Sequence, residues 1–128
     1  MPKQPIYPNP QVKPRGYSPG TRAGDLIFTS GQVSEDAAGK LVGAGDVGAQ
    51  ARQCFKNIEA VLAAAGAKMS DITKINCFLT RAQDVPAYAA VRADVFPTDA
   101  PASSTVIVTA LVNPAYLVEI EAIASTEG

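Results

Sequence analysis

One stretch decides the fold class of this chain: "DVGAQARQCFKNIEAVLAAAGA", residues 46–67. Its apolar side chains recur at spacings of three and four and so form one helical stripe: Val47, Ala51, Cys54, Phe55, Ile58, Val61, Leu62 and Ala65. Asp46 suits the N-cap, where a carboxylate accepts from free backbone amides, and Gly66 stands where glycine commonly follows a helix. We therefore expect a helix over residues 46–65.

Shorter apolar runs on both sides of this helix predict strands. They are "DLIFTSG" (25–31), a short strand near Leu41–Val42, "DITKINCFLTR" (71–81), "SSTVIVTALV" (103–112) and "YLVEIEAIAS" (116–125). Turns are expected at Thr21–Gly24 and Asn113–Pro114, and the proline-rich residues 1–14 read as an extended lead-in. A second helix is expected over 84–97, capped by Asp84 and ended by Pro97. The order predicts an α+β fold with an antiparallel-rich sheet and two helices on one face.

Composition narrows the class of protein. The 128 residues fit one domain, 1–128, and the net charge of −1 without a dense basic run argues against a nucleic-acid partner. Two cysteines, Cys54 and Cys77, do not form a disulfide framework and read as small buried residues. No apolar leader or span is visible, which predicts a cytoplasmic protein without membrane contact. The absence of histidine removes histidine bases, nucleophile partners and metal ligands, and we expect no metal site.

Two features of the sequence concern the sheet face that the helices leave uncovered. Ile27, Phe28 and Val106 would leave that face apolar, which predicts a homo-oligomer that buries it. Glu119 and Glu121 are two residues apart in a strand, so their side chains point to the same face. Such a pair of acids in a nearly apolar strand needs either a cation or a substrate beside it.

Several motifs in this order resemble the RidA family, also called YjgF-like, Rid or L-PSP proteins. They are "GYSPGTRAGDLIFTSGQV", "AQARQCFKNIEAVLAAAGAKMSDITKINCFLT", "VFPTDAPASSTV" and "VEIEAIA", and the resemblance covers about residues 14–126. The resemblance implies a chorismate-mutase-like fold and a homotrimer with a central β-barrel and a small-molecule cleft at each subunit interface. It also implies hydrolysis of reactive imines and enamines, such as 2-aminoacrylate, without a cofactor.

The resemblance also assigns site residues. Tyr17 matches the aromatic residue that lines the cleft, and Ser30 with Gly31 matches the "SG" where backbone and hydroxyl groups meet the ligand. Glu119 matches the acid placed near the attacking water, whereas Glu121 is left as an outward or interface charge. The plain structural alternatives are a cross-strand pairing for Glu119 and a core cap for Tyr17.

One departure from the family pattern concerns the substrate. Where deaminases carry arginine after "PA", gripping the substrate carboxylate, this chain has Ser103, followed by Ser104 and Thr105. Losing such a guanidinium costs on the order of 2–5 kcal/mol of binding. The asparagine of the family's second helix matches Ala89. We expect the 103–105 backbone and hydroxyls to bind a substrate that depends less on its carboxylate.

Three functions remain open at this point. The first is an imine or enamine hydrolase in which Glu119, with its pKa raised by an apolar cleft, positions water. The second is a non-catalytic, metabolite-binding or chaperone-like trimer, and the third is an endoribonuclease, which the charge and the lack of histidine disfavour. Arg22 and Arg15 are candidates to replace the missing cation, although a solvated surface position is the simpler expectation for both.

Overall fold

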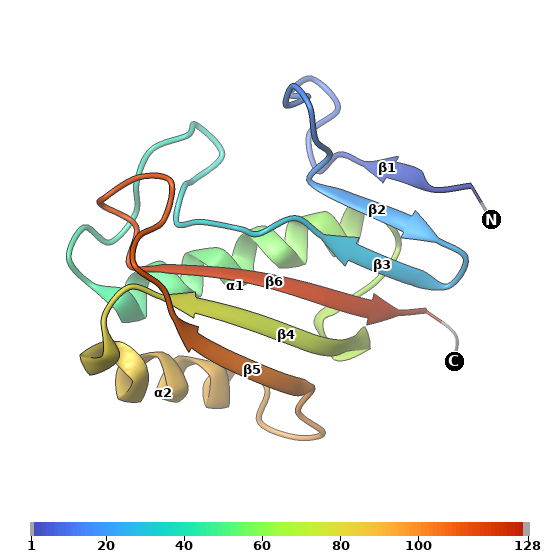
Figure 1. Ribbon diagram of the computed structural model, residues 1–128. Coiled ribbons are helices and arrows are strands. Elements are labelled where there is room, and N and C mark those ends of the chain that lie inside the picture. The colour runs from blue at the N-terminus through green and yellow to red at the C-terminus, as the bar shows by residue number, and fades with distance from the viewer. Residues whose placement is uncertain (1, 127–128) are drawn as a thin grey trace.

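A computed structural model describes residues 2–126, which form a six-stranded mixed sheet and two α-helices (Figure 1). The strands are β1 (Gln4–Ile6), β2 (Gly20–Ala23), β3 (Leu26–Thr29), β4 (Ile72–Leu79), β5 (Ala102–Ile107) and β6 (Val118–Ser125). The helices are α1 (Val47–Ala64) and α2 (Val85–Val95), with short 3-10 turns at Met69–Asp71 and Ala82–Asp84. This architecture confirms the α+β prediction.

The sheet order is β1-β2-β3-β6-β4-β5, so the C-terminal strand β6 lies in the interior of the sheet. All neighbouring strands are antiparallel except β4 and β5, which run parallel because α2 connects them. In the register of β4 and β6, Cys77 lies opposite Ile120 and Phe78 opposite Glu119. The side chains at positions 118, 120 and 122 therefore share one face, and those at 119 and 121 share the other.

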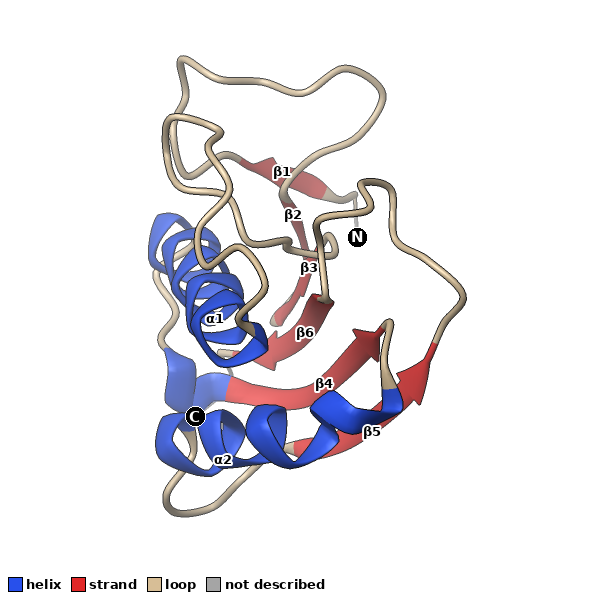
Figure 2. Cartoon of the chain, turned by 90° about the vertical axis from the view of Figure 1, so that its left-hand side faces the viewer, coloured by secondary structure: helices blue, strands red, loops and turns tan. Residues whose placement is uncertain are grey.

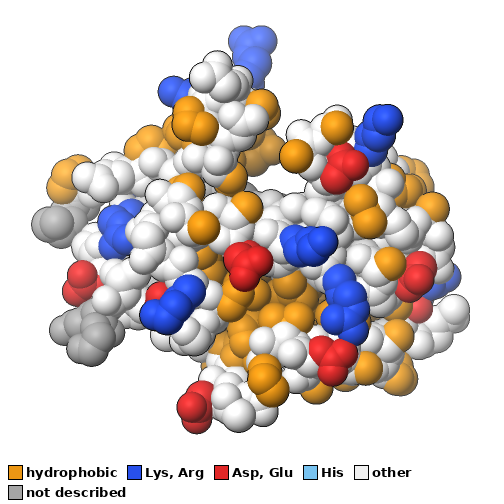
Figure 3. Space-filling model, turned by 180° about the vertical axis from the view of Figure 1, so that it is seen from behind, with side chains coloured by type: hydrophobic (Ala, Val, Ile, Leu, Met, Phe, Trp, Pro, Cys, Tyr) orange, Lys and Arg blue, Asp and Glu red, His pale blue; other side chains and the backbone are white. Residues whose placement is uncertain are grey.

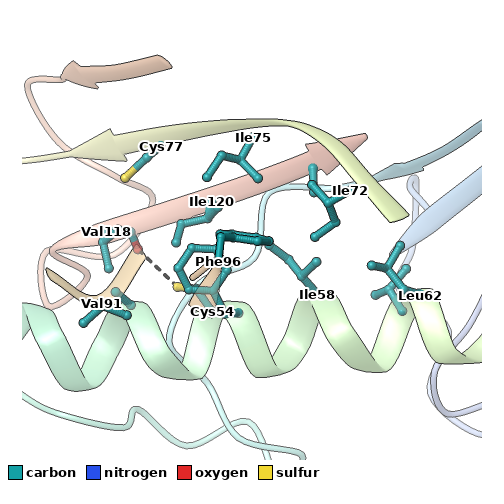
Figure 4. Packing of buried hydrophobic residues seen from close by; sticks show 14 of the residues in the cluster. Cys54, Ile58, Leu62, Ile72, Ile75, Cys77, Val91, Phe96, Val118 and Ile120 are labelled. Atoms are coloured by element: carbon teal, nitrogen blue, oxygen red, sulfur yellow. Dashed lines mark hydrogen bonds between the residues drawn. The ribbon is translucent and has the colours of Figure 1, made fainter. Parts of the chain in front are cut away.

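Both helices cover the same face of the sheet, as the side view shows (Figure 2). Cys54, Ile58 and Leu62 of α1 point toward Ile120 of β6 and the neighbouring strand residues (Figure 4). These side chains are fully buried, and each stabilises the fold by about 1.5–3 kcal/mol where a large aliphatic group leaves water. The apolar stripe read from the sequence is thus the stripe that forms the core.

The expected ends of the first helix are present. The Asp46 side chain accepts a hydrogen bond from the Ala49 amide at 3.1 Å, and Gly66 has a φ of +78°, which glycine adopts without strain. Asp84 precedes α2 but makes no capping bond. Its carboxylate instead accepts two hydrogen bonds from Arg81, at 2.8 and 2.9 Å.

The N-terminal half differs from the prediction in three places. The lead-in contains β1, whose Pro5 is tolerated because β1 is an edge strand. Residues 21–23, expected as a turn, belong to β2. Within the described residues, the region of Leu41 forms only an isolated bridge with Glu35 and no strand. The structure of these segments depends on which strands they pair with, and a short window of sequence carries no information about that pairing.

The sheet face opposite the helices is uncovered in the single chain. Leu26, Phe28 and Val106 are exposed by 42%, 38% and 47%. The exposure of Phe28 and Val106 was expected from the sequence. Ile27 is the exception, since it is fully buried on the helix face. Among the described residues, no helix is long and apolar enough to cross a membrane.

Candidate functional site

Gly31 and Glu119 lie in direct contact on the uncovered side of the sheet. After β3 the chain turns toward β6, where the backbones of Gln32 and Ile120 exchange two hydrogen bonds, at 2.8 and 3.1 Å. This antiparallel pairing brings Gly31 next to β6, where the side chain of Glu119 reaches it. A Cβ atom at position 31 would lie only 2.7 Å from Cδ of Glu119. The carboxyl group occupies the space that glycine leaves free.

The two acids of β6 have different surroundings. Burial raises the pKa of Glu119, and the negative charge of Glu121 raises it further. Glu121 accepts a hydrogen bond from Nδ2 of Asn76 at 3.1 Å. The direction expected for Glu119 is confirmed, and Glu121 acquires a role: its charge favours the protonated form of its neighbour.

Ser30 connects this acid to the loop that carries Tyr17. The Ser30 hydroxyl donates to the Ser18 carbonyl at 2.6 Å, and the Ser30 amide donates to the Pro19 carbonyl at 2.8 Å. These bonds hold the residues after Tyr17 against the end of β3. The Tyr17 side chain remains 60% exposed, so it does not cap the core.

Tyr17 and Gly31 line the same pocket, which has a volume of about 470 Å³. The pocket lies between the N-terminal loop, the loop after β3 and the outer side of α1, which contributes Gln53, Lys56 and Asn57. Seen from the helix side, the two loops stand apart at the top of the molecule (Figure 3). Gly31 thus lines this pocket and also contacts Glu119, which is not itself a lining residue.

The residues at 103–105 lie apart from this group. Strand β4 separates β5 from β6, with Phe78 paired to Glu119 on one side and to Val106 on the other. The Ser104 hydroxyl accepts a hydrogen bond from Lys74 at 2.8 Å. The Thr105 hydroxyl is buried without a hydrogen-bond partner. A single chain thus presents the expected site residues as two separate groups.

The candidate cations have different surroundings. Arg22 donates to the carbonyls of Ala65 and Gly24, at 2.7 and 3.2 Å, and to the Thr126 hydroxyl at 3.2 Å. This guanidinium therefore ties β2 to the C-terminal end of α1. Arg15 lies exposed in the N-terminal loop. In the sheet, strands β3, β6 and β4 lie between Arg22 on β2 and Ser103 on β5.

The remaining reactive groups are buried or dispersed. Cys54 and Cys77 are free thiols with no exposed surface, and burial raises the pKa of Cys77 to about 12. Both thiols are therefore protonated at neutral pH and unreactive. Across residues 2–126, no three histidine, cysteine or acidic side chains are grouped as a metal site would require.

Comparison with known proteins identifies the family. The family model described as Endoribonuclease L-PSP matches residues 10–126. The chain belongs to the RidA/YjgF/L-PSP family. A relative from Dermatophagoides farinae named 2-iminobutanoate/2-iminopropanoate deaminase is 37% identical over 123 residues, covering 96% of this chain and 93% of the relative. The 3-aminoacrylate deaminase RutC of Acinetobacter baylyi is 36% identical over 125 residues, covering 97% and 98%.

Solved structures of other members of the RidA/YjgF/L-PSP family share the fold. The conserved Rid protein YyfA of Yersinia pestis matches with a TM-score of 0.89 and 36% identity, over 98% of this chain and all of that one (100%). The YjgF gene product of E. coli matches with a TM-score of 0.82 and 35% identity, over 88% and 90%. The arrangement of strands and helices described above is therefore that of the family.

Arg92 is a residue near the family's site positions that the sequence did not single out. Its Nη1 atom lies 3.4 Å from the Ser103 hydroxyl oxygen. In the sequence, Arg92 is one charged residue within the segment expected as the second helix. Only its spacing of three from Ala89, the position matched to the family's asparagine, places it on that helix face.

Proposed function

We propose that this chain is an imine or enamine deaminase, which hydrolyses a small reactive metabolite to a carbonyl compound and ammonia. The observation that carries the proposal is the contact of Glu119 with Gly31, together with the raised pKa of Glu119. A carboxyl group whose pKa is raised above its ordinary value is better able both to give and to accept a proton. The names of the two deaminase relatives support the same reaction class.

The proposed chemistry needs one water molecule and one proton shuttle. Protonated Glu119 gives its proton to the imine nitrogen, and the resulting carboxylate takes a proton from the water that attacks the C=N carbon. Glu119 then gives that proton to the amine nitrogen of the tetrahedral aminoalcohol. Ammonia leaves as the C=O bond forms, and the hydroxyl proton passes to the Glu119 carboxylate, which restores its protonated form. An enamine accepts the proton of Glu119 on carbon and so becomes an iminium ion, which water attacks in the same way. The chemistry makes no use of histidine, which the chain lacks.

We propose further that three copies assemble with their uncovered sheet faces inward, which completes the site. Two observations support this assembly: Leu26, Phe28 and Val106 are exposed on that face, and the 103–105 group lies apart from Gly31 and Glu119. A partner copy can bring its own 103–105 strand against Tyr17, Ser30 and Gly31. Because Ser103 carries no charge, we infer a substrate preference unlike that of an enzyme with arginine there.

Turnover of an imine tests the proposal. An L-amino-acid oxidase generates 2-iminopropanoate from alanine, and pyruvate formation above the spontaneous rate is followed with wild type, Glu119→Gln and Glu59→Gln. Glu59 is an exposed residue of α1 and serves as the matched control. We expect Glu119→Gln to lower kcat at least about a hundredfold and Glu59→Gln to leave it unchanged. If the wild type binds ketoacids but accelerates no imine hydrolysis, the protein is a metabolite-binding module.

A further inference from the structure

Helix α2 places a cation, Arg92, beside Ser103, which is uncharged where the family pattern has arginine. In the parallel register of β4 and β5, Ser103 lies opposite Ile75, whose side chain faces the helices. Ser103 therefore points to the same side of the sheet as α2, which runs along β5 (Figure 2). The Arg92 guanidinium donates to the Ser103 hydroxyl across 3.4 Å, a long and weak hydrogen bond. A stronger acceptor can displace it at little cost.

Arg92 has no acidic partner within the described part of the chain. The ion pairs there use Arg52 with Asp94, Lys68 with Asp71 and Arg81 with Asp84. The guanidinium carbon of Arg92 instead lies 5.4 Å from the centroid of the Tyr88 ring, within the range of a cation–π contact. The ring orients the guanidinium but leaves its remaining N–H donors free, and a planar fork of this kind matches a carboxylate.

Two buried hydroxyl groups in this region lack a strong hydrogen-bond partner. The Thr105 hydroxyl makes no hydrogen bond, and the hydroxyl of the fully buried Tyr88 has only the Cys77 thiol and the Arg92 guanidinium beside it. Buried polar groups of folded proteins are nearly always hydrogen-bonded, so each unsatisfied one needs an explanation. Burial, followed by the nearby Cys77, raises the pKa of Tyr88, which keeps its O–H a donor at neutral pH. Arg92, Ser103, Tyr88 and Thr105 thus form one cluster rich in donors and without an acid.

We propose that Arg92, together with Ser103, binds the carboxylate of an anionic imine or enamine substrate. The inference rests on the deaminase function proposed above and names its substrate class. The Ser103 hydroxyl accepts from Arg92 and so directs its own hydrogen away from the guanidinium, toward one oxygen of the carboxylate. The second oxygen takes a free N–H of Arg92. Because this cation comes from the helix and not from β5, the carboxylate sits farther from the strand than an arginine at position 103 would hold it.

The relatives' names agree with this charge requirement. 2-Iminobutanoate, 2-iminopropanoate and 3-aminoacrylate all carry a carboxylate. An acceptor of that charge is what an unpaired guanidinium beside unsatisfied donors would recognise. In the proposed trimer the carboxylate end is held by Arg92 of one protomer, and the C=N end meets Glu119 of its partner.

The test compares Arg92→Gln and Arg92→Lys with Arg52→Gln. Arg52 pairs with Asp94 on the exposed side of α1, which makes it a control for the loss of one surface arginine. With 2-iminopropanoate generated in situ, we expect Arg92→Gln to raise KM at least about tenfold with kcat within about threefold. Arg92→Lys should recover part of the loss because it restores charge without the fork. Adding Ser103→Arg to Arg92→Gln should lower KM again, and Arg52→Gln should change nothing.

A binding measurement separates this inference from the deaminase proposal. Pyruvate, a stable ketoacid, is titrated into isotope-labelled protein and its Kd is read from amide chemical shifts. We expect wild type to bind it and Arg92→Gln to bind it at least about tenfold more weakly, even if no imine is turned over. The inference is overturned if Arg92→Gln, shown to be folded by its thermal unfolding, matches wild type in both KM and Kd. It is equally overturned if wild type neither binds pyruvate nor distinguishes 2-iminopropanoate from a neutral imine.

Discussion

Replacing Gly31 with alanine tests whether the contact with Glu119 positions the reacting group. The added Cβ would lie 2.7 Å from Cδ and 3.0 Å from Cγ of Glu119. Ordinary contact begins at 3.4 Å, so the carboxyl carbon must retreat by about 0.7 Å. The obstacle is the end of a flexible side chain and not backbone, so the fold can accommodate alanine while the carboxyl group moves.

The cost of that movement falls on catalysis. A misplacement of about 1 Å at a reacting centre lowers the rate by about a hundredfold. We therefore expect Gly31→Ala to lower kcat for 2-iminopropanoate by about 30- to 100-fold, which corresponds to about 2–2.7 kcal/mol of transition-state stabilisation. The melting temperature should fall by no more than a few degrees, since the strain is relieved by one side chain.

Two other glycines make the experiment selective. At Gly48 in α1 an added Cβ meets only ordinary contacts, at 3.4 Å from Asp46 and 3.9 Å from Val91, so alanine should change neither activity nor stability for the worse. At Gly20 it would strike Val61 in the core and lie 3.1 Å from the Phe28 carbonyl, so alanine should destabilise the fold by about 1–3 kcal/mol. If Gly31→Ala keeps the wild-type kcat, or loses activity only in proportion to lost stability, Glu119 is not the proton shuttle.

Three further experiments test the stability of the fold and the reactivity of its thiols. Glu119→Gln should raise the free energy of unfolding at pH 7 but not below about pH 4. Folding raises the pKa of this carboxyl, so its ionisation destabilises the folded protein as the pH rises past the pKa of the unfolded chain. Urea unfolding at both pH values measures the difference. The thiols of Cys54 and Cys77 should resist iodoacetamide at pH 8 in the native protein and react in urea, as mass spectrometry can show. Arg22→Gln should lower the melting temperature without altering the Kd for pyruvate, since its guanidinium holds backbone carbonyls.

Local periodicity was enough to predict the elements that make the core. The three-and-four spacing across residues 46–65 predicted α1 to within a residue at each end, because the buried stripe and the capping residues act within one helix. The alternation in 116–125 likewise predicted β6 and the shared face of its two acids. In both cases the physical cause of the structure lies inside the window that was read.

Features that depend on pairing between distant segments were not predictable in this way. β1 exists because Gln4–Ile6 pairs with the free edge of β2, and the prolines of the lead-in 1–14 indicated no strand. The neighbourhood of Arg92 and Ser103 arises from the register of β5 beside β4 and from the rotation of α2 above them. No spacing between positions 92 and 103 encodes that contact, so the sequence alone did not single out Arg92.

The acids of β6 connect the proposed assembly to the proposed chemistry. In the single chain the sheet face that carries Glu119 is exposed to water, and the pKa of Glu119 is already raised. Closing Leu26, Phe28 and Val106 against partner copies would remove more water from that face, and desolvation is already the larger cause of the shift. Assembly should therefore raise the pKa of Glu119 further toward neutrality, where a proton shuttle works best. A charged substitution such as Phe28→Asp, which disfavours burial of the face, should then shift the acidic limb of the pH–rate profile to lower pH in whatever activity survives. If ultracentrifugation shows the variant to be monomeric and the acidic limb of its pH–rate profile is unchanged, the pKa of Glu119 does not depend on assembly and this coupling is contradicted.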